Sequence, residues 1–567
     1  MNRSLPYLGL LVLVLVTFSS CSKKPDAPIP SNAAFVLHIN GNSLSEKLPW
    51  SELKESQWFK LVTENADDDS LGKALLQDPG KSGIDLQSDG WVFIANRGKG
   101  SYAAFSCKLS DPKKFESLVN TVSTEAKIQH KESISYIGGG NNLVSWNDNK
   151  LLVLSDASGL NNAMSGRNSY DESSEDEPSN KYGIDSLLAI AQELYSLKSS
   201  NKLGDNDKFA DLINTKGDVH FWMNAGSLYS NSLAGSLISL SKLSSLLEGN
   251  IATATIAFNE GAIEISSKGY VGKELEGLYN KYKSSNFDED MLKNLPAGEV
   301  NLAMALNYPP EGLKAFLSLL GVDGLVNTFV QEAGFSVDEF VKANSGNIFF
   351  ALSDFKIVKE EKTVDGYDEP YTYTTTEPAG KLLFGAETKE KTAFQKMMEV
   401  AKKLLIEKAG MEEETLSKIP YTLKDKWFLS GNDSSQMKNY AAKKTEHAFI
   451  DRIKGHPIGM YVNIASFISG SQAEFGDGPM AKGLTDLSLQ FWKDIVLTGG
   501  EFEGGASLSN ITLRLGDGKT NSLKSLNQYF SQIAKLAKEV EDRQRAEQET
   551  DDEPSVDSTA VPAEPIK

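Results

Sequence analysis

The sequence predicts an α+β protein made of two tandem related halves, each an antiparallel sheet with helices packed on one face. Two distant stretches, GDVHFWMNAGSL (217–228) and HPIGMYVNIASF (456–467), each read as an apolar strand that ends in Asn and leads into a new segment. On both sides of these phrases, strands joined by short turns recur in the same order, which favours antiparallel pairing. With 567 residues, the chain is also too long for one hydrophobic core.

The first half is predicted over residues 32–290 and the second over 291–535. Each begins with a strand after a proline, in IPSNAAFVLHIN and in LPAGEVNLAMALN. In both halves an amphipathic segment and then a second strong apolar strand follow, and that strand is the first strand of a hairpin.

A helix follows the hairpin in each half. In the first half, Asp111 is the expected N-cap, and Phe115, Leu118, Val119 and Val122 form an apolar stripe at helical spacing. In the second half, Thr388 is the expected cap and Gly410 the end of the helix. The matching stripe there comprises Phe394, Met397, Met398, Ala401, Leu404 and Leu405.

Short strands then predict an antiparallel meander in each half, and a final strand pair closes it. The turns of these closing pairs, 259–261 (NEG) and 503–505 (EGG), occupy equivalent places. Two insertions break the symmetry. An acidic one at 165–182 interrupts the first half, and one at 355–380 lengthens a hairpin of the second, where YTYTTTE alternates as paired strands do.

Residues 1–20 read as a lipoprotein signal peptide. Arg3 supplies a positive charge, and the apolar run of residues 5–18 is too short for a membrane span. The run ends in FSSC, which resembles the lipobox of bacterial lipoproteins, although Phe18 replaces the usual Leu. The resemblance implies that Cys21 is acylated, that residues 21–31 form a tether, and that the protein's partner is a membrane. Cell outer membrane is the expected location, on either its periplasmic or its surface face.

Composition restricts the other partners and the chemistry. The formal net charge is −19, and no basic stripe is available for phosphates, so nucleic acid is not an expected partner. The five histidines show no metal-ligand spacing, and nucleophile-elbow and phosphate-loop motifs are absent from the sequence. No catalytic, cofactor or metal residues are therefore predicted. Cys107 reads as a buried, inert thiol. Residues 536–567 read as a charged helix end and a disordered acidic tail.

Two features concern binding. Asn224 and Asn463 end equivalent strands, and we expect them to cap the segments that follow; a shared binding role is the alternative. The Leu- and Ser-rich stretch 225–249 has a broad apolar face and low helix propensity. It packs either on its own sheet or on a partner protein or lipid.

The lipobox, IPSNAAFVLHING and GIDLQSDGWVFI together resemble an uncharacterised family of Bacteroidota lipoproteins, a domain of unknown function (DUF4836). The resemblance covers most of the mature chain and brings no catalytic residues with it. It implies an outer-membrane lipoprotein of unknown role.

The sequence thus favours a lipid-anchored cell-envelope protein that acts as a non-enzymatic binding or structural module, with an envelope protein as a partner. One alternative is an envelope hydrolase that acts on glycans with carboxylates gathered between the two halves. A weaker alternative is a carrier of lipids or other hydrophobic molecules.

Overall fold

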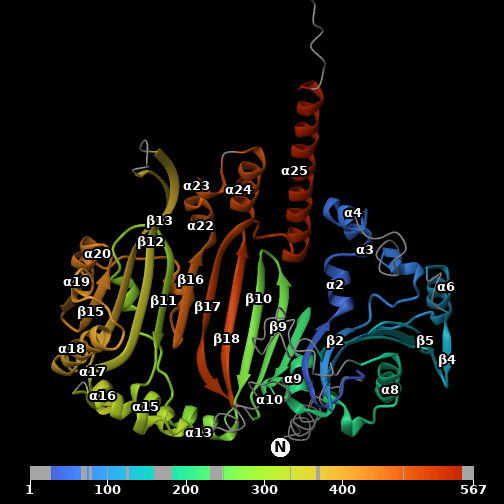
Figure 1. Ribbon diagram of the computed structural model, residues 1–567, viewed down its shortest axis with the longest axis horizontal. Coiled ribbons are helices and arrows are strands. Elements are labelled where there is room, and N and C mark those ends of the chain that lie inside the picture. Colours follow the sequence, from blue (N-terminus) through green and yellow to red (C-terminus); the bar gives the residue numbers. More distant parts are fainter. Residues whose placement is uncertain are drawn as a thin grey trace, which may run out of the picture.

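The computed structural model describes residues 27–64, 73–75, 79–98, 100–122, 127–158, 182–229, 246, 248–332, 334–364, 371–476 and 478–551 (Figure 1). The predicted signal peptide, Cys21, nearly all of the acidic insertion and the end of the tail lie outside these residues. Within the predicted tether, Ala27 and Ile29 are buried in the core of the first half.

Within the described residues, eighteen strands form one continuous antiparallel sheet. The strands are β1 (Ala33–Ile39), β2 (Gly90–Arg97), β3 (Gly100–Lys108), β4 (Gln129–Lys131), β5 (Ile134–Gly139), β6 (Asn142–Trp146), β7 (Lys150–Asp156), β8 (Val219–Asn224), β9 (Ile251–Asn259), β10 (Ala262–Tyr270), β11 (Val300–Asn307), β12 (Asn344–Val364), β13 (Tyr371–Thr388), β14 (Tyr421–Lys424), β15 (Trp427–Gly431), β16 (Ile458–Asn463), β17 (Trp492–Glu503) and β18 (Ala506–Leu515).

The helices connect these strands and extend beyond them. They are α2 (Gly41–Lys47), α3 (Trp50–Leu53), α4 (Gln57–Glu64), α6 (Pro112–Val122), α8 (Ile184–Tyr195), α9 (Asp207–Asn214), α10 (Ala225–Tyr229), α13 (Lys273–Lys281), α14 (Asp290–Lys293), α15 (Pro310–Leu320), α16 (Asp323–Glu332), α17 (Val337–Ala343), α18 (Lys391–Glu407), α19 (Glu413–Ser417), α20 (Ser434–Asn439), α21 (Ile450–Ile453), α22 (Ile464–Gly470), α23 (Gln472–Phe475), α24 (Pro479–Phe491) and α25 (Ser522–Asp551).

The strand order across the sheet runs β4-β5-β6-β7-β3-β2-β1-β8-β9-β10-β18-β17-β16-β11-β12-β13-β15-β14. The predicted α+β class and antiparallel pairing are confirmed. The prediction of a separate sheet in each half is wrong, because β10 and β18 pair along their whole length, from Ala262 opposite Arg514 to Tyr270 opposite Ala506.

Away from the central strands, helices lie on both faces of the sheet in each half, not on one face as predicted. Leu151 and Leu152 of β7 are 2% and 1% exposed, although neighbouring side chains of a strand point to opposite faces. Leu152 belongs to a core that includes residues of α8 and α9, and Leu151 packs with Phe115 and Val119 of α6. A sheet buried on both faces favours continuous apolar runs over alternation, as in the LLVL of β7.

The second half is covered in the same way. Leu429 of β15 joins a core built with α14, α20 and α21, while Phe428 packs on the other face against Phe394 of α18, at a ring distance of 5.4 Å. The helix α18 begins after Glu390, so Thr388 is not its cap as predicted. Thr388 ends β13 and donates its hydroxyl to the carbonyl of Lys426.

Two elements project from the body (Figure 1). Residues 356–364 of β12 pair with residues 371–379 of β13 as a two-stranded ribbon that rises beyond its neighbours. The helix α25 packs at its start against α4 and α24 and then runs outward. No single helix in the described ranges is long and apolar enough to cross a membrane; α15 and α16, bent by 116°, pass that test only as a pair.

The centre of the sheet contains a buried ion cluster. Asp494 of β17 lies 3.0 Å from Arg452 and accepts a hydrogen bond from Nε of Arg514 at 2.8 Å. Its side chain is 4% exposed. Burial alone would raise the pKa of the Asp494 carboxyl, but the two guanidinium groups lower it below its ordinary value.

We therefore expect Asp494→Asn to lower the free energy of unfolding by about 2 kcal/mol, because it leaves two partly buried cations without their carboxylate. Urea denaturation followed by circular dichroism measures this. The matched control is Asp451→Asn, whose side chain is 76% exposed and pairs with Lys454; it should leave the urea midpoint close to that of the wild type. Equal effects of both variants would contradict a buried cluster.

Candidate functional site

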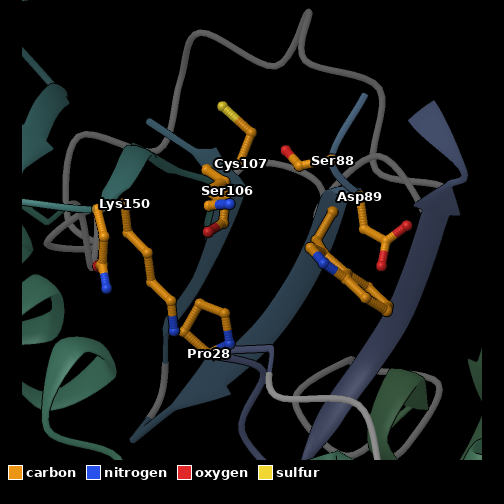
Figure 2. Close-up of a pocket in the computed structure, with 9 residues that line it drawn as sticks. Pro28, Ser88, Asp89, Ser106, Cys107 and Lys150 are labelled. Atoms are coloured by element: carbon orange, nitrogen blue, oxygen red, sulfur yellow. The ribbon is translucent and has the colours of Figure 1, made fainter. Parts of the chain in front are cut away.

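A polar cavity of about 230 Å³ opens where β2, β3 and β7 meet the start of the described chain (Figure 2). It is lined by Pro28, Ser88, Asp89, Trp91, Ser106, Cys107, Lys108, Asn149 and Lys150. Figure 2 shows Lys150 and Asp89 on opposite sides of this polar cavity, with Ser106 between them in the view. One acid and two lysines thus face the same small space.

Strand register explains why these residues meet. Ser106 of β3 pairs with Trp91 of β2, Trp91 with His38 of β1, and His38 with His220 of β8. Directly paired residues point to the same face of a sheet. One row of polar and aromatic side chains therefore crosses four strands and ends at the cavity. The ring of Trp91 lies over that of His38, with centroids 4.2 Å apart.

The two histidines form a buried proton chain. His38 and His220 are 3% and 2% exposed, and their Nδ1 atoms are 2.9 Å apart. His220 Nε2 lies 2.8 Å from the carbonyl oxygen of Thr215 and so donates to it. The Nδ1 atom of His220 then accepts a hydrogen bond from Nδ1 of His38. The other ring nitrogen of His38, Nε2, lies 3.1 Å from Oδ1 of Asp89 but forms no hydrogen bond. Burial lowers the pKa of His220.

Cys107 supplies no nucleophile to this cavity. Burial raises the pKa of its thiol to about 12, so the thiolate is negligible at neutral pH. In Figure 2 its sulfur points away from Pro28 and Lys150. The prediction of an inert thiol agrees with this environment.

A second, apolar cavity of about 450 Å³ lies among α22, α23 and α24. It is lined by Ile468, Phe475, Gly478, Met480, Ala481, Leu484, Thr485 and Ser488, none of which carries a charge. The two hydroxyl groups are already bonded, Thr485 to the carbonyl of Ala481 and Ser488 to the hydroxyl of Tyr529. Phe475 at its edge is 52% exposed. Such a lining suits a ligand without hydrogen-bonding groups.

The predicted binding residues occupy other places. The Asn224 side chain accepts from the backbone of Ser227 at 3.2 Å, and that of Asn463 accepts from Ser466 at 3.1 Å. Both therefore start the next helix, as expected of caps, and neither lines the two cavities. Most of the Leu- and Ser-rich stretch, 230–245 and 247, lies outside the described residues.

Within the described residues, neither cavity brings together carboxylates from the two halves in the way that the hydrolase alternative predicts. The β10–β18 ladder joins the halves directly, and the polar cavity contains one carboxylate, that of Asp89. Sequence reasoning missed the polar cavity because its residues come from separate strands. His38 within an apolar strand was the one available signal.

Comparison with known proteins identifies a family but no activity. A family described as a domain of unknown function, DUF4836, matches residues 26–454. No curated protein matches the chain. Crystal forms III, I and IV of TP0453 align with TM-scores of 0.25, 0.24 and 0.24 at 12%, 11% and 12% identity. These alignments cover 46%, 46% and 45% of this chain and 87%, 86% and 85% of those chains. Similarity this low carries no functional inference.

The buried His220 makes stability depend on pH. Since its folded pKa is depressed, the unfolded state binds more protons as pH falls through the ordinary value of 6.5, and stability falls with it. His220→Gln should flatten this loss between pH 7.5 and 5.5, measured as the urea midpoint. His130→Gln, at an exposed position, should leave the wild-type slope unchanged. An unaltered slope in His220→Gln would mean that this ring does not titrate on unfolding.

Proposed function

Since the chain belongs to the DUF4836 family, whose function is unknown, we propose from its own residues that it is a lipid-anchored, non-enzymatic binding protein of the cell envelope. Its apolar cavity would hold a hydrophobic ligand, and an envelope protein would be the partner that supplies or receives that ligand. This proposal joins the binding-module hypothesis to the carrier hypothesis.

The anchor is supported by the lipobox and by the start of the core. Ala27, the sixth residue after Cys21, is 4% exposed within the first core. A fully extended segment of that length spans about 20 Å. An acylated Cys21 would therefore hold the body close beside a bilayer, with the outer membrane as the proposed location.

We also propose that the two halves arose by duplication, and matching strand pairs support this. β1 pairs with β2 and β8 as β11 pairs with β12 and β16. Ser266 and Asn510 each lie five residues after the turn glycines Gly261 and Gly505, and they are directly paired at the middle of the β10–β18 ladder. Paired equivalent residues are what a two-fold axis between related halves produces.

The apolar cavity is the observation that carries the binding role. Its volume falls within the range of small-molecule sites, and its lining brings together apolar side chains of three helices. On its other side, α24 packs closely on α25, where a Cβ added to Gly483 would lie 2.7 Å from Leu536. The packing of α25 against α24 therefore holds this wall of the cavity in place, as expected of a preformed site.

Acylation predicts that Cys21→Ala will lose both membrane fractionation and labelling by an alkyne fatty acid in growing cells. Detection by click chemistry and immunoblotting of cell fractions measures both. Cys107→Ala is the matched control and should keep both, because that thiol is buried in the body. Continued labelling of Cys21→Ala would contradict acylation at Cys21.

Filling the apolar cavity should weaken ligand binding. Ala481→Trp places a large ring inside it, and we expect at least about a tenfold loss in affinity for a dansylated fatty acid, measured by fluorescence titration. Leu325→Trp, at a position 75% exposed on α16, is the control and should bind as wild type does. Equal affinity in wild type and Ala481→Trp, or no binding by wild type, would contradict this site.

A further inference from the structure

We propose that the polar cavity of the first half binds a small zwitterion that carries a primary ammonium and an anionic group, as phosphoethanolamine does. The ligand is either the headgroup of a phospholipid or a free molecule of the same chemistry. This site is distinct from the apolar cavity, which has no charged lining residue.

Lys150 is the residue that would bind the anionic group of the ligand. Its ammonium lines the cavity and has no acidic partner within 4 Å in the described part of the chain. The hydroxyl of Ser106, a residue 2% exposed, also faces the cavity without a hydrogen-bond partner there. Lys108 adds a second cation, although it lies 3.5 Å from Asp85. A partly buried lysine that shares a cavity with an unused hydroxyl donor can bind a phosphate or carboxylate.

Asp89, on the opposite wall, is the residue that would bind the ammonium of the ligand. The Asp89 side chain is 53% exposed and touches the buried chain only through His38 at 3.1 Å, so it keeps acceptor capacity toward the cavity. Trp91 also lines the cavity. An exposed carboxylate attracts a compact cation by its charge, and an aromatic residue in the same lining favours such a cation.

The spacing of the two walls fits a small zwitterion. Lys108 pairs with Lys150 across β3 and β7, and Asp89 precedes β2 on the other side of β3. Adjacent strands are about 4.8 Å apart, so the backbones of the two walls are separated by roughly 10 Å. The Asp89 carboxylate is directed toward His38 of β1, 3.1 Å away, and Lys150 lies on the opposite side of the cavity, so the two charges flank the space between the walls. A short zwitterion with an anion at one end and an ammonium at the other matches this arrangement.

The corresponding place in the second half supports this assignment. When the two halves are aligned by their strand ladders, the pair Phe349–Gly385 of the second half corresponds to Trp91–Ser106 of the first. Two residues further along the strand, Glu387 corresponds to Lys108. Its carboxylate is bonded by Asn347 at 2.6 Å and by Ser345 at 2.8 Å, and it lies 2.5 Å from Lys426. In the second half, the cation Lys426 is therefore paired with the carboxylate of Glu387, whereas in the first half Lys150 is available to bind a ligand.

The position of the cavity favours a lipid as the source, and this step rests on the proposed anchor. Pro28, which lines the cavity, is seven residues after Cys21. Seven residues span at most about 25 Å, so an acylated chain holds the cavity beside headgroups.

The test is calorimetric titration of the full mature chain in maltoside micelles with glycerophosphoethanolamine. We expect saturable binding that Lys150→Met weakens by about tenfold or more. Asp89→Asn should weaken glycerophosphoethanolamine similarly but leave glycerol phosphate, which lacks the ammonium, unchanged. Lys113→Met, an exposed lysine on α6, is the matched control and should bind as wild type does. No binding by wild type, or wild-type affinity in Lys150→Met, overturns the proposal.

Flotation of Cys21→Ala with vesicles distinguishes the two sources of the ligand. Recovery with phosphatidylethanolamine vesicles but not with phosphatidylcholine vesicles supports a lipid headgroup. Binding of the soluble ligand without such recovery supports a free zwitterion. Failure of the anchor would appear separately, as absent fatty-acid labelling of Cys21, and would leave the calorimetric result intact.

Discussion

The hydrogen-bonded ladder between β10 and β18 is the constraint on which the rest of the structure depends. These two strands close the first and second halves, and alone each would expose an unpaired edge. Their antiparallel pairing removes both edges and turns the halves into one sheet. The relative position of the two halves is therefore set by backbone hydrogen bonds and not by a flexible linker.

Burial on both faces of this sheet follows from the apolar strands themselves. Because consecutive residues such as Leu151 and Leu152 are both apolar, each face needs its own helices, and each half therefore has two cores. Polar groups on such strands must find partners or open onto a cavity. The row that runs from Ser106 through Trp91 to His38 and His220 does both, since its outer end borders the polar cavity and its inner end is bonded to Thr215.

The two halves share a pattern of strand pairing but differ in their chemistry. The first half has a charged cavity beside the start of the described residues, whereas in the second half Glu387 and Lys426 form an ion pair. The apolar cavity belongs to the second half, among helices that follow β16. The charged cavity and the apolar cavity therefore lie in different halves of the one sheet.

The sequence by itself determined the local elements and the strand pairs near each other in the chain. Asp111 caps its helix as predicted, its side chain accepting from the backbone of Lys114, and Asn224 and Asn463 cap theirs, because such caps depend on a few neighbouring residues. Only the tertiary structure decided that the sheets merge and that Asp89, Ser106 and Lys150 share a cavity. Those contacts join residues far apart in the chain through strand register, and register is settled by packing over the whole sheet.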